Sequence, residues 1–519
     1  MANKKETTDD GRGKTPIAPE RLATGNPGLD SILEGGFPVN RVYLVEGDPG
    51  TGKTTLALNF LLEGAARGEP VLYITLSETK DEIEDVAASH GWSLDGLNIY
   101  ELIPSEETLK AESQYTIFHP SEVEFSETTT AVLEQVERIQ PRRVVFDSLS
   151  EMRLLARDPL RYRRQILALK QYFAGRQCTV LLLDDRTATG SDLQVRSIAH
   201  GVVELEQLAL DYGAERRRLR VVKLRGSRYR GGFHDFRIET GGVVVYPRLV
   251  AAEHQQEFAR GMITSGVAAL DELLGGGLDR GSSTLILGPA GSGKSSIAAQ
   301  YAAAAAERGE RAASFIFDEG ANTYLTRAAG LGRDMRQQVE GGHMTLQQID
   351  PAELSPGEFA HFVRRAVDVD GARVVVIDSL NGYLQAMPDE RFLTVQMHEL
   401  LMYLNQQGVV TILVMAQHGF LGSQMGTPVD VSYLADSVLM LRFFEARGEV
   451  RRAISVVKKR AGYHEKAIRE MRMSSQGISV GEPLKDFHGV LTGAPSYSNE
   501  SPPLIKEIDK PGGRGDAGD

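Results

Sequence analysis

The chain has 519 residues, enough for roughly two to four domains, and its 41% apolar and 25% charged residues are ordinary for a globular protein. Its 58 basic and 70 acidic residues leave a net charge of −12, which argues against a protein that coats nucleic acid through bulk positive charge. The single cysteine, Cys178, excludes an internal disulfide, and no run of about eighteen apolar residues suggests a membrane-spanning helix. We therefore expect a cytoplasmic protein with neither a membrane nor a nucleic-acid partner.

An internal repeat organises the chain. The segments 28–55 and 268–296 are similar along their length, and two later blocks recur in the same order. The matched positions include Asp30 and Asp271, Gly47 and Gly288, Asp147 and Asp378, and Lys223 and Lys458. This repeat predicts a tandem duplication of one domain of about 230 residues. The predicted organisation is a disordered leader at 1–17, a first domain at 18–247, a linker at 248–260, a second domain at 261–491 and a disordered tail at 492–519.

Short apolar runs and helical stretches alternate along each copy. In the first copy, strands are predicted at 41–47, 70–76, 142–147 and 178–185, and a helix is predicted at 57–68. The second copy repeats the pattern with strands at 283–288, 311–317, 372–378 and 409–416 and a helix at 297–309. Near-continuous apolar strands that alternate with helices predict an α/β fold in each copy, with a mainly parallel sheet flanked by helices.

Each copy carries a glycine-rich phosphate loop between its first predicted strand and its first predicted helix. Residues 47–54 and 288–295 both fit the pattern GxxxxGK[ST]. Glycines let backbone N–H groups turn toward phosphate oxygens, the lysine reaches the β- and γ-phosphates, and the final hydroxyl is available to Mg²⁺. The predicted ATP-binding residues of these P-loops are Gly47, Gly50, Thr51, Gly52, Lys53, Thr54 and Thr55 in the first copy, and Gly288, Gly291, Ser292, Gly293, Lys294, Ser295 and Ser296 in the second.

Acidic residues follow two further strands of each copy. Asp147 and Asp378 each end an apolar strand, where a Walker-B carboxylate holds the Mg²⁺ shell, although such an aspartate can also be a turn residue. The carboxylates after the strand that follows the P-loop helix can polarise an attacking water or hydroxyl, with a solvated loop charge as the alternative. The predicted Mg²⁺ ligands are Thr54, Asp147, Ser295, Asp318 and Asp378, and the predicted catalytic residues are Glu78, Asp318 and Glu319.

Basic residues follow a late strand in each copy. Lys223–Arg225 and Lys458–Arg460 recur with the repeat, which favours cations that stabilise charge on a γ-phosphate, including that of a neighbouring subunit, over exposed edge charges. The run Arg216–Arg218 lacks a matched aromatic platform, so we expect a solvated hairpin there.

The combination of these motifs resembles the KaiC family of circadian clock protein kinases over residues 18–490. The resemblance rests on the doubled P-loop domain, the strand-ending Asp-Ser pairs, the KLRG motif at 223–226 and the segment Tyr463–Glu470. It implies two RecA-like P-loop NTPase domains in an ATP-dependent double-ring homohexamer, with nucleotide between subunits. It also implies slow ATP hydrolysis in the first ring, serine/threonine autokinase and autophosphatase activity in the second, and ATP with Mg²⁺ as cofactors.

The resemblance also carries nucleotide contacts over to matching positions. Besides the P-loop residues, these contacts are Ser89, Lys223, Leu224, Arg225 and Ser227 in the first ring and Arg452, Lys458, Lys459, Arg460, His464 and Lys466 in the second. Family members place two successive glutamates at the base position, whereas this chain has Ser77–Glu78 and Asp318–Glu319. The missing first carboxylate weakens the expectation of hydrolysis in the first ring, and Asp318 keeps the charge on a shorter side chain.

The phosphoacceptor pair of the family falls at Ser432 and Tyr433, with Thr427 nearby. Ser432 takes the serine position and a tyrosine stands where the clock protein has threonine, so the resemblance favours Ser432 as acceptor. The Pro- and Gly-rich tail argues against a KaiA-like activator, while a KaiB-like protein or a histidine-kinase-type signalling protein stays open as a partner. Two other readings stay open: an ATP-gated signalling scaffold without kinase activity, and, less favoured, a RecA-like DNA-dependent ATPase.

Overall fold

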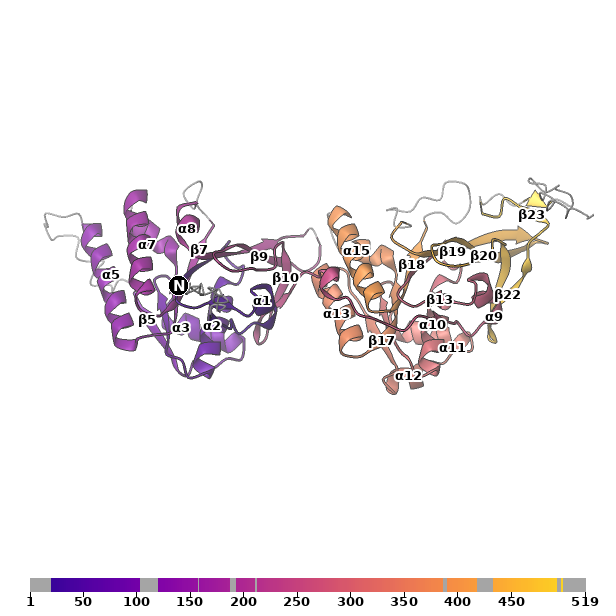
Figure 1. Cartoon of the computed structure of the whole chain (residues 1–519), viewed down its shortest axis with the longest axis horizontal. Coiled ribbons are helices and arrows are strands. Elements are labelled where there is room, and N and C mark those ends of the chain that lie inside the picture. The colour runs from indigo at the N-terminus through magenta and orange to yellow at the C-terminus, as the bar shows by residue number, and fades with distance from the viewer. Residues whose placement is uncertain are drawn as a thin grey trace, which may run out of the picture. The chain divides into compact units, whose positions relative to one another are not determined.

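The computed structural model describes residues 20–102, 120–156, 158–186, 193–210, 212–385, 390–417, 433–491 and 496–497. The chain divides into two compact units between Arg248 and Leu249, and each unit contains one copy of the repeat (Figure 1). The predicted leader at 1–17 lies outside the described residues. Of the helices that the structure describes, none is both long enough and apolar enough to cross a membrane.

A nine-stranded sheet forms the centre of the first unit, in the order β11-β10-β9-β8-β3-β7-β6-β4-β5. The strands from β8 to β5 in that order are parallel, and β9, β10 and β11 extend the sheet with antiparallel pairings. The strands are β1 (Arg21–Leu22), β2 (Phe37–Pro38), β3 (Val42–Gly47), β4 (Val71–Thr75), β5 (Leu97–Glu101), β6 (Arg143–Asp147), β7 (Thr179–Asp185), β8 (Gly201–Leu208), β9 (Arg216–Leu224), β10 (His234–Glu239) and β11 (Gly242–Tyr246). The helices are α1 (Pro27–Ile32), α2 (Lys53–Ala66), α3 (Lys80–Ser89), α5 (Pro120–Ile139), α6 (Leu149–Ala156), α7 (Pro159–Ala174) and α8 (Leu193–Ile198).

The second unit repeats this architecture, with the sheet order β16-β15-β17-β18-β14-β19-β20-β21-β22. Its strands are β12 (Met262–Ile263), β13 (Leu278–Asp279), β14 (Ser283–Gly288), β15 (Arg311–Ile316), β16 (Met344–Gln348), β17 (Ala372–Asp378), β18 (Val410–Ala416), β19 (Ser437–Ala446), β20 (Glu449–Lys459), β21 (Arg469–Ser474), β22 (Gly477–Pro483), β23 (Phe487–His488) and β24 (Ser496–Tyr497). Its helices are η1 (Ala251–Glu253), α9 (Ala268–Leu273), α10 (Lys294–Glu307), α11 (Ala321–Gly330), α12 (Arg336–Glu340), α13 (Pro356–Asp368), α14 (Leu380–Gln385) and α15 (Glu390–Gln406).

Helices cover both faces of each sheet. In the first unit, α1, α2 and α3 bury their apolar side chains on one face, and α5, α6, α7 and α8 bury theirs on the other (Figure 1). In the second unit, α9, α10 and α11 cover one face, and α13, α14 and α15 cover the other. This arrangement confirms the predicted fold class, and it follows from strands that are apolar on both sides. Because the parallel strands share one direction, their carboxyl ends meet at a single edge of each sheet.

The segment predicted as an inter-domain linker packs against the second unit. Leu249 and Ala251 join the core under α13–α15, and the Ala251 N–H donates to Glu399 Oε2 at 3.1 Å. The ring of Phe258 lies where a side chain at Gly281 or Gly408 would have to be, so these glycines make room for it. Residues of the predicted linker are therefore part of the second unit's surface rather than free chain.

Two sequence predictions are wrong in the structure. The run Arg216–Arg218 does lie in a hairpin, formed by β8 and β9, but the prediction that it is solvated is wrong. Arg216 is buried, and the Arg218 guanidinium lies 4.0 Å from the Phe233 ring centroid and pairs with Glu206 at 2.7 Å. The aromatic partner was missed because it comes from a residue fifteen positions later. The predicted disordered tail, from residue 492, contains β24, which pairs with β23; the rest of that tail lies outside the described residues.

Candidate functional site

The P-loop of the first copy joins β3 to α2 at the edge of the sheet where the parallel strands end. Gly50 and Gly52 have φ angles of 81° and 93°, a region that glycine adopts without steric cost. The ammonium group of Lys53 donates to two carbonyl oxygens of the loop at 2.9 and 3.0 Å, and it forms an ion pair with Asp185 Oδ1 at 2.7 Å. The Asp185 carboxylate is thus the charged partner of Lys53.

Carboxylates from two strands meet beside that loop. Thr54 Oγ1 donates to Asp147 Oδ2 at 3.2 Å, and the buried Tyr73 hydroxyl donates to the same oxygen at 2.6 Å. Burial raises the pKa of Asp147, and the two hydroxyl donors oppose that rise. Glu78 Oε2 is buried with no hydrogen-bond partner among the described residues, and burial together with the charge of Asp147 raises the pKa of Glu78. The Mg²⁺ and base residues predicted for the first copy therefore lie at one place.

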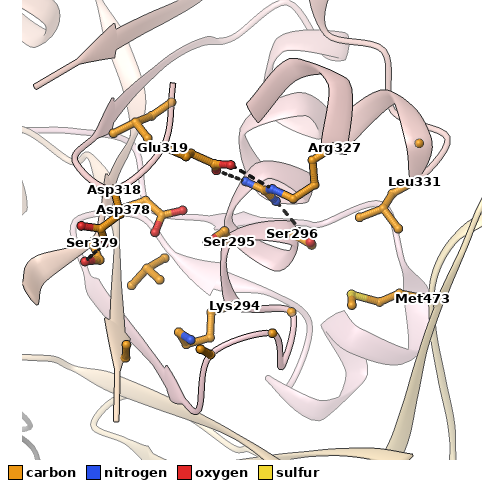
Figure 2. A pocket seen from close by; sticks show the side chains of 17 residues that line it. Lys294, Ser295, Ser296, Asp318, Glu319, Arg327, Leu331, Asp378, Ser379 and Met473 are labelled. Carbon is orange, nitrogen blue, oxygen red and sulfur yellow. Dashed lines mark hydrogen bonds and ion pairs between the residues drawn. The ribbon is translucent and has the colours of Figure 1, made fainter. Parts of the chain in front are cut away.

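The second copy holds a cavity of about 510 Å³ beside its P-loop (Figure 2). Its lining includes Lys294, Ser295, Asp318 and Asp378 on a charged side and Leu331 and Met473 on an apolar side. Lys294 Nζ donates to Pro289 O at 2.9 Å, and burial lowers the pKa of this lysine. A cavity with one cationic, hydroxyl-bearing part and one apolar part suits a nucleotide, whose phosphates and base need these two environments.

Asp378 presents an unsatisfied oxygen. Its Oδ2 is buried and has no hydrogen-bond partner in the part of the chain that the structure describes. The Ser295 hydroxyl hydrogen-bonds the same carboxyl group, and burial raises the pKa of Asp378 to about 6. A free carboxylate oxygen next to a P-loop hydroxyl fits Mg²⁺, which proteins hold through one or two carboxylates plus phosphate and water. Thr54 and Asp147 form the corresponding pair in the first copy.

The two predicted bases of the second copy have different partners. Asp318 faces the cavity and accepts a hydrogen bond from the Ser379 hydroxyl. Glu319 forms an ion pair with Arg327 of α11, and Arg327 Nη1 also donates to Ser296 Oγ at 3.2 Å (Figure 2). Asp318 is therefore the carboxylate without a cation bound directly to it, whereas the charge of Glu319 is neutralised by a guanidinium group.

Asp185 is a site residue that the sequence analysis missed. It ends β7, the neighbour of β3 in the sheet, and so reaches Lys53. The acid was visible at the end of the predicted strand 178–185, and the rule that parallel strands end at one edge would have placed it at the P-loop. In the second copy Ala416 stands at this place, because Gly47 pairs with Asp185 and Gly288 pairs with Ala416.

Arg327 and Tyr73 were missed as well. Neither residue belongs to a sequence motif. The signal that could have identified them is the comparison of the two copies, which differ at both positions. With the offset of 241 residues that relates Gly47 to Gly288, Val86 corresponds to Arg327 and Ser314 corresponds to Tyr73. Each copy therefore completes its site with side chains that the other copy lacks.

The basic motif of the first copy lies at the opposite edge of the sheet from the P-loop. Lys223 and Leu224 end β9, and Lys223 pairs with Val202 near the start of β8. The N–H of Arg225 donates to His200 O at 2.8 Å, just before β8 begins. Because β8 and β3 are parallel, this is the edge at which β3 starts, whereas the P-loop follows its end.

The second copy has the same arrangement. Lys458 pairs with Val438 near the start of β19, and the N–H of Arg460 donates to Asp436 O at 2.9 Å. β19 is parallel to β14, so these cations also lie away from the P-loop of their own copy. Each basic motif thus lies at the end of the sheet opposite the P-loop of its own copy.

Two further residues that were predicted to contact nucleotide lie in different surroundings. Arg452 lies on β20 near the P-loop, and its Nε donates to Gly291 O at 3.4 Å. Lys459 is buried: its ammonium group donates to Leu274 O at 2.5 Å and lies 3.3 Å from Asp279 Oδ2. The side chain of Lys459 therefore holds the end of α9, and its contact with nucleotide stays a prediction.

The remaining predicted residues lie as follows. Ser89 ends α3, and Gly330, at the corresponding place in α11, lines the cavity of the second copy. Ser227 follows β9, and His464 and Lys466 follow β20. The predicted acceptors Ser432 and Thr427 lie outside the described residues, whereas Tyr433 is described and 52% exposed.

Replacing Asp185 with alanine should tighten ATP binding to the first copy by about tenfold, because the phosphates no longer compete with a carboxylate for Lys53. Ala416→Asp in the second copy is the reciprocal change and should weaken binding there by a similar factor. Cross-linking with photoreactive ATP and mapping of the labelled peptides gives the half-saturation of each copy separately. Equal or weaker binding in Asp185→Ala would show that Asp185 does not compete with nucleotide.

Comparison with known proteins gives one family. The family described as "ATPase: KaiC" matches residues 22–250 and 263–485. The chain is 26% identical over 498 residues to "Circadian clock protein KaiC3" of Synechocystis sp., covering 93% of this chain and 96% of the relative. It is likewise 26% identical over 481 residues to "Circadian clock oscillator protein KaiC" of Synechococcus elongatus, with 92% of each chain covered.

Proposed function

The chain belongs to the KaiC ATPase family, and on that premise we propose that both copies bind and hydrolyse ATP and that the second copy also phosphorylates the protein itself. The observation that carries the proposal is the cavity of the second copy. It combines a P-loop lysine, a hydroxyl and carboxylate pair suited to Mg²⁺, and Asp318, a carboxylate whose neighbour is a serine hydroxyl rather than a cation. These are the parts that phosphoryl transfer requires.

In the proposed reaction a serine hydroxyl oxygen attacks the γ-phosphorus, the bond from that phosphorus to the bridging oxygen breaks, and ADP leaves. Asp318 accepts the proton of the attacking hydroxyl, and Lys294 stabilises the charge that develops on the phosphate oxygens. When bound, Mg²⁺ neutralises charge on the phosphates, and Ser295 and Asp378 are placed to hold it. Hydrolysis is the same displacement with water in place of the serine.

The first copy is proposed to hydrolyse ATP without a protein acceptor. Its half-buried Glu78 lies beside Asp147 and is the carboxylate available to orient water, since Ser77 offers none. The raised pKa of Glu78 suits a group that takes up a proton. Two copies with different carboxylates would thus divide hydrolysis and self-phosphorylation between them.

We propose that the chain assembles as a homohexameric double ring. The basic motifs lie at the edge opposite the P-loops, so they can complete a nucleotide site in another subunit through a head-to-tail contact. Head-to-tail contacts that close on themselves generate rings. The acceptor segment ends on the same edge, because Arg460 Nη2 donates to Tyr433 O at 2.7 Å. In the ring, an acceptor would therefore face the nucleotide of the neighbouring subunit.

ATP should drive this assembly. Nucleotide held between subunits makes contacts that a monomer lacks, and a ligand that binds the assembled state stabilises it. We expect hexamers in saturating Mg·ATP and smaller species after nucleotide removal, measured by light scattering coupled to size exclusion. A monomer that persists at saturating Mg·ATP would contradict the ring.

Incubation of the purified chain with γ-labelled ATP tests the activity. We expect both released phosphate and label on the protein, with the label in the second copy. Hydrolysis without protein label would favour an ATP-gated scaffold, and hydrolysis that depends on added DNA would favour a recombinase-like motor. The relatives' printed names suggest a role in circadian timing. A KaiB-like or histidine-kinase-type partner stays a prediction from the family resemblance.

A further inference from the structure

Arg327 is a charged residue of the second cavity that no P-loop or Walker motif contains. It lies on α11 and is one of the residues that line the cavity (Figure 2). Its guanidinium group contacts Glu319 twice, through the ion pair and through Nε to Oε2 at 3.4 Å. Its third contact is the bond from Nη1 to Ser296 Oγ at 3.2 Å. The arginine thus joins a loop carboxylate to the first turn of the P-loop helix.

The contact with Ser296 places the guanidinium group close to where phosphates bind. Ser296 is the third residue of α10, a helix of 14 residues whose first N–H groups have no partner within the helix. Those N–H groups, with the preceding glycine loop, are the anion-binding part of a P-loop. An arginine that already touches this turn needs only a side-chain rotation to reach a phosphate oxygen.

Glu319 and a phosphate would compete for the same donors. The Glu319 carboxylate and the P-loop turn lie on two sides of the guanidinium group, which contacts both at once (Figure 2). A polyphosphate carries more negative charge than one carboxylate and accepts bidentate hydrogen bonds from the same fork. Nucleotide binding would therefore draw the arginine away from Glu319.

The first copy lacks this arginine and its ion pair. Val86 stands at the position of Arg327, and the corresponding glutamate, Glu78, has a buried oxygen with no partner among the described residues. The comparison within one chain shows that a P-loop site of this fold forms without the arginine. The arginine is therefore an addition to the second copy rather than a requirement of the fold.

We propose that Arg327 is a nucleotide-binding residue of the second copy, which exchanges its ion pair with Glu319 for a phosphate oxygen when ATP binds. The inference rests on the proposed binding of ATP to this cavity. It predicts opposite changes in ATP affinity for two substitutions. Removing Arg327 deletes a phosphate contact and weakens binding, whereas removing the charge of Glu319 frees the arginine and strengthens binding.

The test compares Arg327→Val, which installs the residue of the first copy, with Arg327→Lys and Glu319→Gln in the full chain. Cross-linking of photoreactive ATP with Mg²⁺, followed by peptide mapping, gives the half-saturation of each copy in the same molecule. We expect the second-copy value to rise about tenfold in Arg327→Val and less in Arg327→Lys, because lysine keeps the charge without the fork. It should fall about threefold in Glu319→Gln.

Two controls distinguish a local effect on the second copy from a general loss of folding. The half-saturation of the first copy should stay constant in all variants and reports that the protein is folded. Arg333→Val removes another arginine that is ion-paired, to Glu307 at 2.7 Å, outside the cavity lining, and it should leave both values unchanged. Weaker ATP binding in both Arg327→Val and Glu319→Gln would show that the ion pair has a purely structural role and would overturn the inference. Unchanged ATP binding in both variants would overturn it as well. Wild-type protein that cross-links in the first copy alone would refute the proposed function of the cavity and the inference with it.

Discussion

Replacing Lys294 with alanine should reduce phosphorylation of the protein at least a hundredfold. Lys294 is buried in the P-loop and lines the cavity, and its ammonium group donates to the Pro289 carbonyl oxygen at 2.9 Å. Burial lowers the pKa of this lysine, and the nearby carboxylates of Asp378 and Asp318 oppose that shift. Deleting the cation removes its attraction to the triphosphate in the bound state and in the transition state. The measurement is the rate of label transfer from γ-labelled ATP, with saturation tested by raising the ATP concentration.

The matched variant is Lys53→Ala in the first copy. It should remove nucleotide binding from that copy and weaken assembly, while the chemistry of the second copy survives in whatever rings still form. Light scattering and label transfer measured on the same sample separate the two effects. Equal phosphorylation in wild type and Lys294→Ala would exclude the second copy as the kinase.

Replacing Ser432 with alanine should erase most of the protein-bound label. In-line transfer requires the attacking oxygen to lie next to the γ-phosphorus, and a tyrosine hydroxyl lies several ångströms further from its backbone than a serine hydroxyl. The backbone carbonyl of Tyr433 accepts a hydrogen bond from the Arg460 guanidinium group at 2.7 Å. Phosphopeptide mapping after incubation with labelled ATP measures the distribution of label.

The controls are Tyr433→Phe and Thr427→Ala, and both should retain most of the label. The side chain of Tyr433 is 52% exposed, so removing its hydroxyl should not disturb the core. A dominant phosphotyrosine at position 433 would refute Ser432 as the main acceptor. Label confined to position 427 would do so as well.

The features that recur in both copies could be predicted from short stretches of sequence. The strands, the P-loops and the strand-ending aspartates were predictable because each depends on a short pattern: an apolar run, a glycine spacing, or an acid at a strand end. The duplication strengthened each of these predictions. It also placed Lys223 and Lys458 in register, although their position opposite the P-loops became visible through the pairing of β9 and β20.

The parts that could not be predicted depend on side chains distant in the sequence. Arg327 is recognisable as a site residue through its contact with Ser296, 31 positions earlier, and Lys459 is buried because it reaches the end of α9, 185 positions earlier. Arg218 was misjudged for the same reason, since its aromatic partner Phe233 lies fifteen positions later, just before β10. Positions at which the two copies differ, such as Asp185 in the first and Ala416 in the second, could not be assigned a role from the repeat.

The separation of basic motif and P-loop on opposite edges of each sheet has a genetic consequence. In the proposed ring, a site is built from two chains, one giving the P-loop and the next giving the cations at Lys223 or Lys458. A chain that has lost both functions would then disable its own site and the site of a neighbour. When wild-type and defective chains mix at random, the active fraction falls with the square of the wild-type share. A defective chain that still assembles would therefore lower activity by more than its own share of the mixture.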